Sequence, residues 1–272
     1  MKKLVKIMIG IIALVGFYYL NNNWLQVSRY NVALKNLPPS MDGLKVVQIS
    51  DLHNAKFGEN QERLIAEVKL QKPDIIVLTG DLVDRNHYVL DRSLAAVKGF
   101  VEMAPTYFVD GNHEISLNKE DEIHSALSEL GVTVLNNEAT DFTWHNGVIS
   151  IVGISDPLTG ESTEDMLTKA LHQVPKNRFT LLLAHRSEFV ADYAKYGIDV
   201  VYTGHAHGGQ VRVPGVGGLI DHQGHLFPDY LEGVVKTGET QQIISRGLGN
   251  SLFPARVFNR PEIVVSILKS KP

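Results

Sequence analysis

The sequence predicts an α/β fold of parallel βαβ units that follows an N-terminal transmembrane helix. The first observation is a regular alternation, in which short β-branched apolar runs are separated by segments with helical spacing of apolar residues. The second is that side chains of metal-binding type come directly after several of these runs. The third is an apolar run behind a cluster of lysines at the start of the chain.

The composition narrows the classes of function. The chain has 272 residues, of which 44% are hydrophobic, and a formal net charge of −4. This length favours one large core over two small ones. Because the charge is negative and no basic stripe is present, we do not expect general binding to a nucleic-acid backbone. The absence of cysteine excludes disulfides, thiolate zinc sites and a cysteine nucleophile.

The first residues predict an uncleaved membrane anchor over residues 1–23. Lys2, Lys3 and Lys6 precede an almost uninterrupted apolar run from Ile7 to Leu20. At about 1.5 Å per residue, such a helix reaches the short end of the range that spans a bilayer. The lysines are expected to stay cytoplasmic, which predicts a single-pass cell-membrane protein whose remaining chain is extracytoplasmic. A cleaved signal peptide is the alternative, but no small-x-small site follows the run.

After the anchor, residues 24–43 are expected to be a connector with turn chemistry, and residues 44–272 to form the globular domain. Between Gly204 and Gly249 lie 11 of the 23 glycines, which predicts loops around a site instead of a long helix. The apolar runs predict strands at 44–50, 75–78, 106–109, 132–135, 140–144, 148–152, 179–184, 199–203, 241–245 and 262–267. Helical spacing predicts helices at 58–70, 90–100, 119–130, 163–172 and 187–195.

Polar side chains of metal-binding type follow five of the predicted strands. Because the carboxyl ends of the strands in an open α/β sheet form one edge, such side chains are expected to converge. The separations Asp51 to Asp81 and Asp81 to Asn112 are 30 and 31 residues, close to one βαβ unit. The candidate ligands are Asp51, His53, Asp81, Asn112, His185, His205 and His207.

The ligand types predict two divalent metal ions. Four imidazoles, two carboxylates and one amide oxygen suit Mn²⁺, Zn²⁺ or iron better than Ca²⁺ or Mg²⁺ alone. The set is too large for one tetrahedral ion, and it suits two ions that share a carboxylate and keep positions for water and substrate. A lone loop histidine is usually an ordinary polar residue, but the convergence of all these groups favours a metal site.

Five motifs in this order resemble the blocks of the calcineurin-like metallophosphoesterase family. They are Asp51-Leu52-His53, Gly80-Asp81-Leu82-Val83-Asp84, Gly111-Asn112-His113-Glu114, His185 and Gly204-His205-Ala206-His207. The resemblance covers roughly residues 44–267 and implies a four-layer αββα sandwich. The anchor, Gly208-Gly209-Gln210 and residues 245–251 are similar to a bacterial membrane-associated subgroup of this family.

The resemblance also implies a role for each residue of the set. One ion is expected at Asp51, His53, Asp81 and His207, and the second at Asp81, Asn112, His185 and His205. Asp81 would bridge the two ions. His113 is implied to be a catalytic residue and not a ligand, because it would face the substrate and stabilise or protonate the leaving oxygen. General-acid assistance of this kind is worth about 10²–10⁴-fold in rate.

Other polar residues are expected to have supporting roles. Asp84 is interpreted as a cap or Asx turn, and Glu114 as a residue that orients a ligand. Arg186 takes the place of a small or amide residue in many relatives, and either favours an anionic substrate or, as the preferred interpretation, points to solvent. Arg246 and Arg256 are either phosphate clamps or salt-bridged structural residues. The histidines interpreted as surface or packing residues are His87, His124, His145, His172, His222 and His225.

The predicted activity is metal-dependent hydrolysis of a phosphomonoester, phosphodiester or pyrophosphate bond. The anchor favours a lipid-linked or envelope substrate, such as a UDP-diacylglucosamine-like pyrophosphate. The loop from Leu219 to Leu231, with Phe227 and Tyr230, is a candidate apolar lip for such a substrate. The alternatives are a nucleotide-directed phosphodiesterase and a non-catalytic metal-binding membrane scaffold. Because every expected ligand position is filled, the scaffold is the less favoured alternative.

Overall fold

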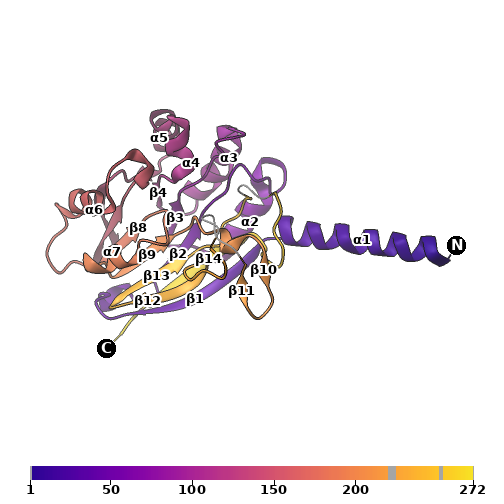
Figure 1. Cartoon of the computed structure of the whole chain (residues 1–272). Coiled ribbons are helices and arrows are strands. Elements are labelled where there is room, and N and C mark those ends of the chain that lie inside the picture. Colours follow the sequence, from indigo (N-terminus) through magenta and orange to yellow (C-terminus); the bar gives the residue numbers. More distant parts are fainter. Residues whose placement is uncertain (1, 220–224, 251–253, 272) are drawn as a thin grey trace.

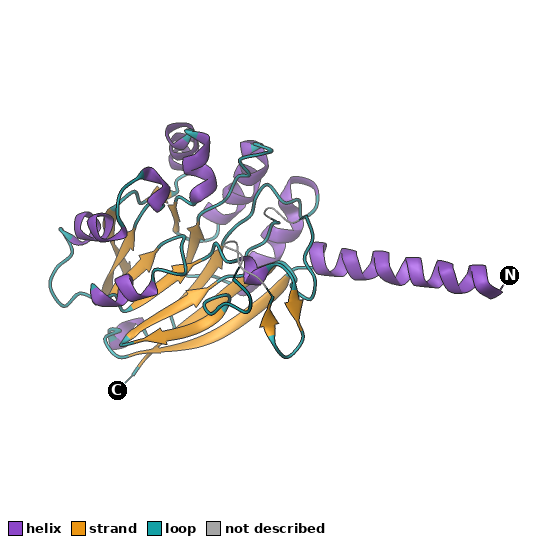
Figure 2. Cartoon of the chain, in the orientation of Figure 1, coloured by secondary structure: helices purple, strands orange, loops and turns teal. Residues whose placement is uncertain are grey.

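Two six-stranded sheets pack face to face in the computed structural model, which describes residues 2–219, 225–250 and 254–271. The first sheet has the order β1 (Gln26–Leu34), β14 (Glu262–Ser270), β2 (Lys45–Ile49), β3 (Ile75–Thr79), β4 (Thr106–Val109) and β5 (Thr133–Val134). The second has the order β12 (Gly233–Thr237), β13 (Thr240–Ile244), β9 (Val200–Thr203), β8 (Thr180–Leu183), β7 (Gly147–Gly153) and β6 (Glu138–Trp144). Figures 1 and 2 show the two layers of strands.

Helices cover the outer face of each sheet. The first sheet carries α2 (Glu62–Gln71), α3 (Leu90–Val101) and α5 (Glu120–Glu129), and the second carries α6 (Thr163–Leu171) and α7 (Val190–Lys195). The short helix α4 (Asn112–Leu117) follows β4 directly. Single 3-10 turns lie at Pro39–Met41, Glu59–Gln61, Pro157–Thr159 and His207–Gly209. The predicted αββα sandwich is therefore confirmed.

Alternation along the strands explains why both faces of each sheet are buried. In β2, Val46 lies in the core between the sheets and Val47 lies under the helices, since successive side chains of a strand point to opposite faces. In β8, Leu181 and Leu183 join the core between the sheets, and Leu182 packs under α6 and α7. A strand that is buried on both faces reads as a continuous apolar run, which is why these strands were predictable.

Residues 24–43, which were expected to be a connector, contain a strand of the first sheet. β1 pairs in parallel with β14 over its whole length, from Gln26 beside Glu262 to Leu34 beside Ser270. Val32 and Leu34 are buried in the core between the sheets. Polar residues earlier in the strand hide this pattern in the sequence, because an edge strand buries only part of each face. The expectation of a simple connector is wrong for this stretch.

A small hairpin, an edge strand and a short helix were also not predicted. The Gly-rich stretch forms a small hairpin of β10 (Arg212–Val213) and β11 (Gly217–Gly218), and β12 pairs antiparallel with β13 at the sheet edge. Helix α4 begins at Asn112, directly after β4, where no helix was predicted. Each of these elements is short, so it carries too few residues to show a periodicity.

Helix α1 (Lys2–Asn23) projects away from the body of the protein (Figure 1). It is the one described helix that is long and apolar enough to cross a membrane, and signal sequences share these properties. Most of its large apolar side chains are exposed, including Leu14, which is 68% exposed. Its last turn contacts the body, because Arg63 Nη2 donates to the Asn23 carbonyl at 2.9 Å.

A partly buried ion pair fixes α5 against the end of β4. His124 Nε2 lies 2.8 Å from Asp110 Oδ1, and Asp110 is almost fully buried. Burial by itself lowers the pKa of His124, but the hydrogen bond and charge of Asp110 outweigh it, so the pKa is raised. His124 is thus a packing residue, as predicted, with a charged partner that the sequence did not reveal.

The substitution His124→Leu is expected to destabilise the protein more at pH 6 than at pH 9. The folded-state pKa of His124 is raised above its ordinary value of 6.5. Its stabilisation is therefore complete below about 6.5 and is lost as the pH rises through the raised value. Urea unfolding of the metal-free protein measures the difference, which we expect to be about 1–3 kcal/mol at low pH. A loss that does not vary with pH would contradict this assignment.

Candidate metal centre

All seven predicted ligands lie together at the carboxyl ends of five strands. Asp51 and His53 follow β2, Asp81 follows β3, and Asn112 opens α4 after β4. The remaining three histidines follow β8 and β9 of the second sheet. The site thus lies where the edges of both sheets meet, and all seven residues are buried.

Five of these residues have a left-handed backbone conformation. The positive φ angles are 51° at Asp51, 45° at His53, 53° at Asp81, 68° at His205 and 49° at His207. Such angles are uncommon outside glycine, and Asp, Asn and His adopt them more readily than other residues do. They lie directly after β2, β3 and β9, where the chain turns sharply at the site. Strain of this kind persists only where the surrounding structure holds it, and it gathers at functional sites.

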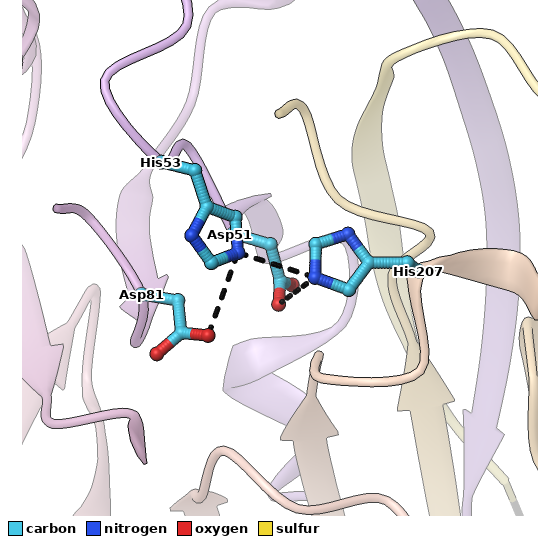
Figure 3. A group of neighbouring side chains, drawn as sticks. All are labelled: Asp51, His53, Asp81 and His207. Atoms are coloured by element: carbon cyan, nitrogen blue, oxygen red, sulfur yellow. Dashed lines mark hydrogen bonds and ion pairs between the residues drawn. The ribbon is translucent and has the colours of Figure 1, made fainter. Parts of the chain in front are cut away.

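The first group of side chains is shown in Figure 3. His53 Nε2 and His207 Nε2 face each other at 3.2 Å. Asp51 Oδ1 lies 3.3 Å from His207 Nε2, and Asp81 Oδ2 lies 3.5 Å from His53 Nε2. Each of these four residues offers one ligand atom, and these atoms all lie within 4.8 Å of one another. Two imidazole nitrogens and two carboxylates that converge in this way suit a divalent cation.

The second group shares Asp81 with the first. His185 Nε2 lies 3.3 Å from Asp81 Oδ2, 3.2 Å from Asn112 Oδ1 and 3.1 Å from His205 Nδ1. The same oxygen of Asp81 therefore faces one imidazole of each group. Asp81 is therefore the carboxylate that two ions, one in each group, could share.

The charges at the centre favour a cation. Burial by itself lowers the pKa of His185, but the charge of Asp81 and that of Asp51 outweigh it and raise the pKa to about 10. Burial raises the pKa of Asp51 to about 6. Burial also lowers the pKa of His53 to about 4 and that of His207 well below its usual value, so both rings are neutral at neutral pH, as metal ligands must be. His185 is charged at neutral pH without a metal ion, and an ion bound at its Nε2 would displace that proton.

Hydrogen bonds from outside the group hold the ligands in place. His185 Nδ1 donates to the Thr79 carbonyl at 2.8 Å, which leaves Nε2 free to face Asp81. Glu114 accepts from the backbone N–H groups of Asp81, Gly111 and Val83 at 2.8, 2.8 and 3.1 Å. Its carboxylate therefore ties the loop after β3 to the loop after β4. This agrees with the interpretation of Glu114 as an orienting residue.

His113 lies next to the ligands, with Nε2 at 4.0 Å from Asp81 Oδ2. The backbone N–H of Arg85 donates to its Nδ1 at 3.0 Å, so the proton of the neutral ring is on Nε2. Asp84 Oδ1 accepts from the backbone N–H groups of Asn86 and His87, which confirms the predicted turn. Its other oxygen, Oδ2, lies 3.8 Å from both His113 Nδ1 and His53 Nδ1, a second role that the sequence analysis missed.

Arg186 does not point to solvent, so the preferred interpretation of this residue was wrong. Its Nε and Nη2 donate to the two oxygens of Asp156 at 2.7 and 3.1 Å, and Asp156 is fully buried. Its Nη1 lies 3.0 Å from His205 Nε2. The guanidinium therefore supports the outer side of His205, whose Nδ1 faces His185. Asp156 was not singled out from the sequence, because its partner is 30 residues away in the chain.

Arg246 and Arg256 are structural. Arg246 Nη2 donates to Glu262 at 2.9 Å, and Arg256 is 1% exposed and donates to the carbonyls of Gly249 and Arg246. Their guanidinium groups are engaged by these protein partners, which favours the structural interpretation over that of phosphate clamps.

Of the remaining histidines, His87, His145, His172 and His225 are exposed. His222 and residue 251 of the late motif lie outside the described residues.

The donor atoms fit two divalent ions, and the arrangement is that of a dinuclear metallohydrolase. Residues 44–209 match the family model of the calcineurin-like phosphoesterases. This is more than half of the chain, and the chain belongs to the calcineurin-like phosphoesterase family. It is accordingly a metal-dependent phosphoesterase, and the buried His/Asp cluster is its dinuclear divalent metal site.

Relatives extend over almost the whole chain. The metallophosphoesterase YkuE of Bacillus subtilis is 28% identical over 93% of this chain and 88% of its own length. The phosphodiesterase YaeI of Escherichia coli is 30% identical over 91% of this chain and 90% of its own length. Among solved structures, TT1561 of Thermus thermophilus has a TM-score of 0.53 at 13% identity, over 76% of this chain and 90% of that one. That likeness supports the fold.

Gly204→Ala is expected to abolish tight metal binding. A Cβ at Gly204 would lie 1.9 Å from Ser50 Oγ and 2.3 Å from Asp51 Oδ2, so the Asp51 carboxylate, a predicted ligand, would have to leave its place. Gly10→Ala is the matched control, because a Cβ at Gly10 has no neighbour within 4 Å. Bound metal per chain, measured by elemental analysis after gel filtration, distinguishes the two variants. Retention of both ions by Gly204→Ala would contradict the arrangement of the site.

Proposed function

We propose that the protein hydrolyses phosphate esters with two divalent ions held by the seven predicted ligands. One ion would be bound by Asp51, His53, Asp81 and His207, and the second by Asp81, Asn112, His185 and His205. The observation that carries this proposal is the position of Asp81 Oδ2, 3.5 Å from His53 Nε2 in the first group and 3.3 Å from His185 Nε2 in the second. Two bound ions would neutralise charge on the phosphoryl oxygens and lower the pKa of water.

His113 is proposed to act on the leaving oxygen. Its Nε2 carries the proton of the neutral ring and faces the centre, because Nδ1 accepts a hydrogen bond from Arg85. A hydrogen bond from Nε2 to the leaving oxygen stabilises the negative charge that develops as the bond to phosphorus breaks. Asp84, at 3.8 Å from Nδ1, stabilises positive charge on the ring if it takes up a second proton.

The proposed substrate is a phosphate ester with a lipid part, for example a UDP-diacylglucosamine-like pyrophosphate. Exposed apolar side chains support this: Val216, Leu226, Phe227 and Phe258, which we call the helix-side rim, are 65%, 67%, 56% and 53% exposed. The stretch that carries the first three adjoins residue 257, because Val211 bridges Val257, and Leu219 N–H donates to the Val211 carbonyl. The Phe258 ring packs edge-to-face on Phe17 of α1 at 5.1 Å. An apolar surface beside a membrane-spanning helix suits contact with acyl chains.

An apolar groove lies beside Phe258 of this rim. It has a volume of about 430 Å³ and is lined by Leu14, Val15, Phe17 and Tyr18 of α1 and by Ala255, Arg256 and Val257. Part of the predicted lip, residues 220–224, lies outside the described residues, and Phe227 and Tyr230 are both exposed as a lip requires. We further propose that α1 is a single-pass anchor, with Lys2, Lys3 and Lys6 in the cytoplasm and the domain outside.

The first test of this function is turnover of bis-p-nitrophenyl phosphate by the full chain with Mn²⁺. His113→Ala is expected to lower kcat by about 10²–10⁴-fold, because the leaving oxygen loses its donor, while both ions stay bound. Elemental analysis of the variant checks the second part. Loss of an ion from His113→Ala would make His113 a ligand, and absence of any turnover in the metal-replete wild type would favour a binding scaffold.

The lipid part of the proposal is tested with the double variant Val216→Ser/Leu226→Ser. Because two apolar side chains leave the lipid contact, kcat/KM for a phosphate ester embedded in vesicles is expected to fall about 10-fold or more, with no change for bis-p-nitrophenyl phosphate. Leu70→Ser is the control, since Leu70 is 72% exposed on α2, outside the helix-side rim. Equal losses on both substrates would contradict the lipid substrate, and faster turnover of cyclic nucleotides would favour a nucleotide-directed enzyme.

A further inference from the structure

The last turn of α1 is joined by hydrogen bonds to the segment 254–259, which supports His207 of the metal centre. We propose that Asn21 and Asn22 are positioning residues for the first metal site. The end of the apolar helix would then help to hold the histidine ligands of that site in place. This inference rests on the proposed dinuclear function. It assigns to α1 a role in the site that is separate from anchoring.

Asn22 makes the closest connection between the helix and this segment. Its Oδ1 accepts from the Arg256 backbone N–H at 2.8 Å, and its Nδ2 lies 3.3 Å from the Arg256 carbonyl, which accepts from it. The same Oδ1 accepts from Asn250 Nδ2 at 3.2 Å. Asn21, which is buried, accepts from the Asn259 backbone N–H through its Oδ1 at 3.3 Å. Two successive side chains of α1 therefore hold the two ends of residues 256–259.

From this segment, two contacts reach His207. Asn259 Nδ2 donates to the His207 carbonyl at 2.7 Å, and Arg256 Nη2 lies 3.4 Å from His207 Nδ1. Both Arg256 and Asn259 are almost fully buried, at 1% and 0% exposed. His207 has a left-handed φ of 49°, a conformation that its surroundings must maintain. The ring presents Nε2 to Asp51 and His53, while the hydrogen bond from Asn259 holds the His207 backbone and Arg256 packs against the outer side of the ring.

Asn250 extends the same support to His53. It follows Gly249, where a Cβ would lie 2.4 Å from the Leu52 carbonyl and 2.9 Å from His53 Cβ. The loop that carries His53 after β2 therefore packs against Gly249, which directly precedes Asn250, a hydrogen-bond partner of Asn22. Both imidazoles of the first metal site depend on the position of the end of α1, whereas His185 and His205 are supported by Thr79 and Arg186.

A consequence concerns the fate of the N-terminal segment. Cleavage of a signal peptide after residue 22 or shortly beyond would remove Asn21 and Asn22. The first metal site would then lose its outer support. The proposal therefore requires that α1 be retained in the mature enzyme.

The test uses the full-length protein in detergent micelles, with Mn²⁺ titrated into the metal-free form. Removal of partners outside the ligand sphere typically costs about 10–100-fold in metal affinity, and we expect Asn22→Ala to weaken one of the two ions by about 10-fold. Asn23→Ala is the matched control, because the described contacts of the Asn23 side chain are limited to the Tyr19 carbonyl of its own helix. Asn22→Asp keeps the acceptor for Arg256 and is expected to restore most of the affinity.

A spectroscopic measurement identifies which ion is affected. In the Co²⁺-substituted protein, Asn22→Ala is expected to change the absorption of one ion only, and Asn21→Ala to change the same one. Thermal melts of the metal-free variants show that each is folded. Wild-type affinity for both ions in Asn22→Ala, or equal effects of Asn22→Ala and Asn23→Ala, would overturn the proposal and leave the proposed function intact. A wild-type protein that binds no second ion would overturn both.

Discussion

The Asp81 carboxylate is almost fully buried between two groups of imidazoles, and a negative charge in that position is costly unless cations or hydrogen-bond donors surround it. Burial alone would raise its pKa, but His185 and the neighbouring rings outweigh burial and hold the pKa well below its usual value. Oδ1 accepts from the His113 backbone N–H at 2.9 Å, while Oδ2 faces the two groups. The negative charge of Asp81 is thus stabilised best when a cation lies on the side of each group of imidazoles.

The fold supplies this arrangement by bringing the carboxyl ends of strands from two sheets to one place. The first sheet provides Asp51, His53, Asp81 and Asn112, and the second provides the remaining histidines. Left-handed turns and glycines permit the close approach of the loops: a Cβ at Gly111 would lie 2.3 Å from Asp81 Oδ1. The core between the sheets fixes their relative position, because its side chains interdigitate with little room to shift.

The sequence allowed the central strands and the ligand set to be predicted, since both depend on local patterns. β3 and β8 are continuous apolar runs, and the ligands come directly after such runs. β1 was missed because its partner β14 is far away in the chain, and its outward residues Arg29 and Asn31 interrupt the apolar pattern. Two further contacts were missed for the same reason, because each joins residues that are distant in the chain. They are the bidentate pair of Arg186 with Asp156 and the contact of Asn22 with Arg256. Periodicity carries no information about such pairs.

The proposed dinuclear site depends most on the sharing of Asp81 by two ions. A crystal structure of the full chain with Mn²⁺, with anomalous data collected near the manganese edge, tests it directly. We expect two anomalous peaks about 3.5–4 Å apart, with the Asp81 carboxylate in contact with both, His53 and His207 at one peak and His185 and His205 at the other. A single peak, or two peaks of which Asp81 contacts only one, would contradict it.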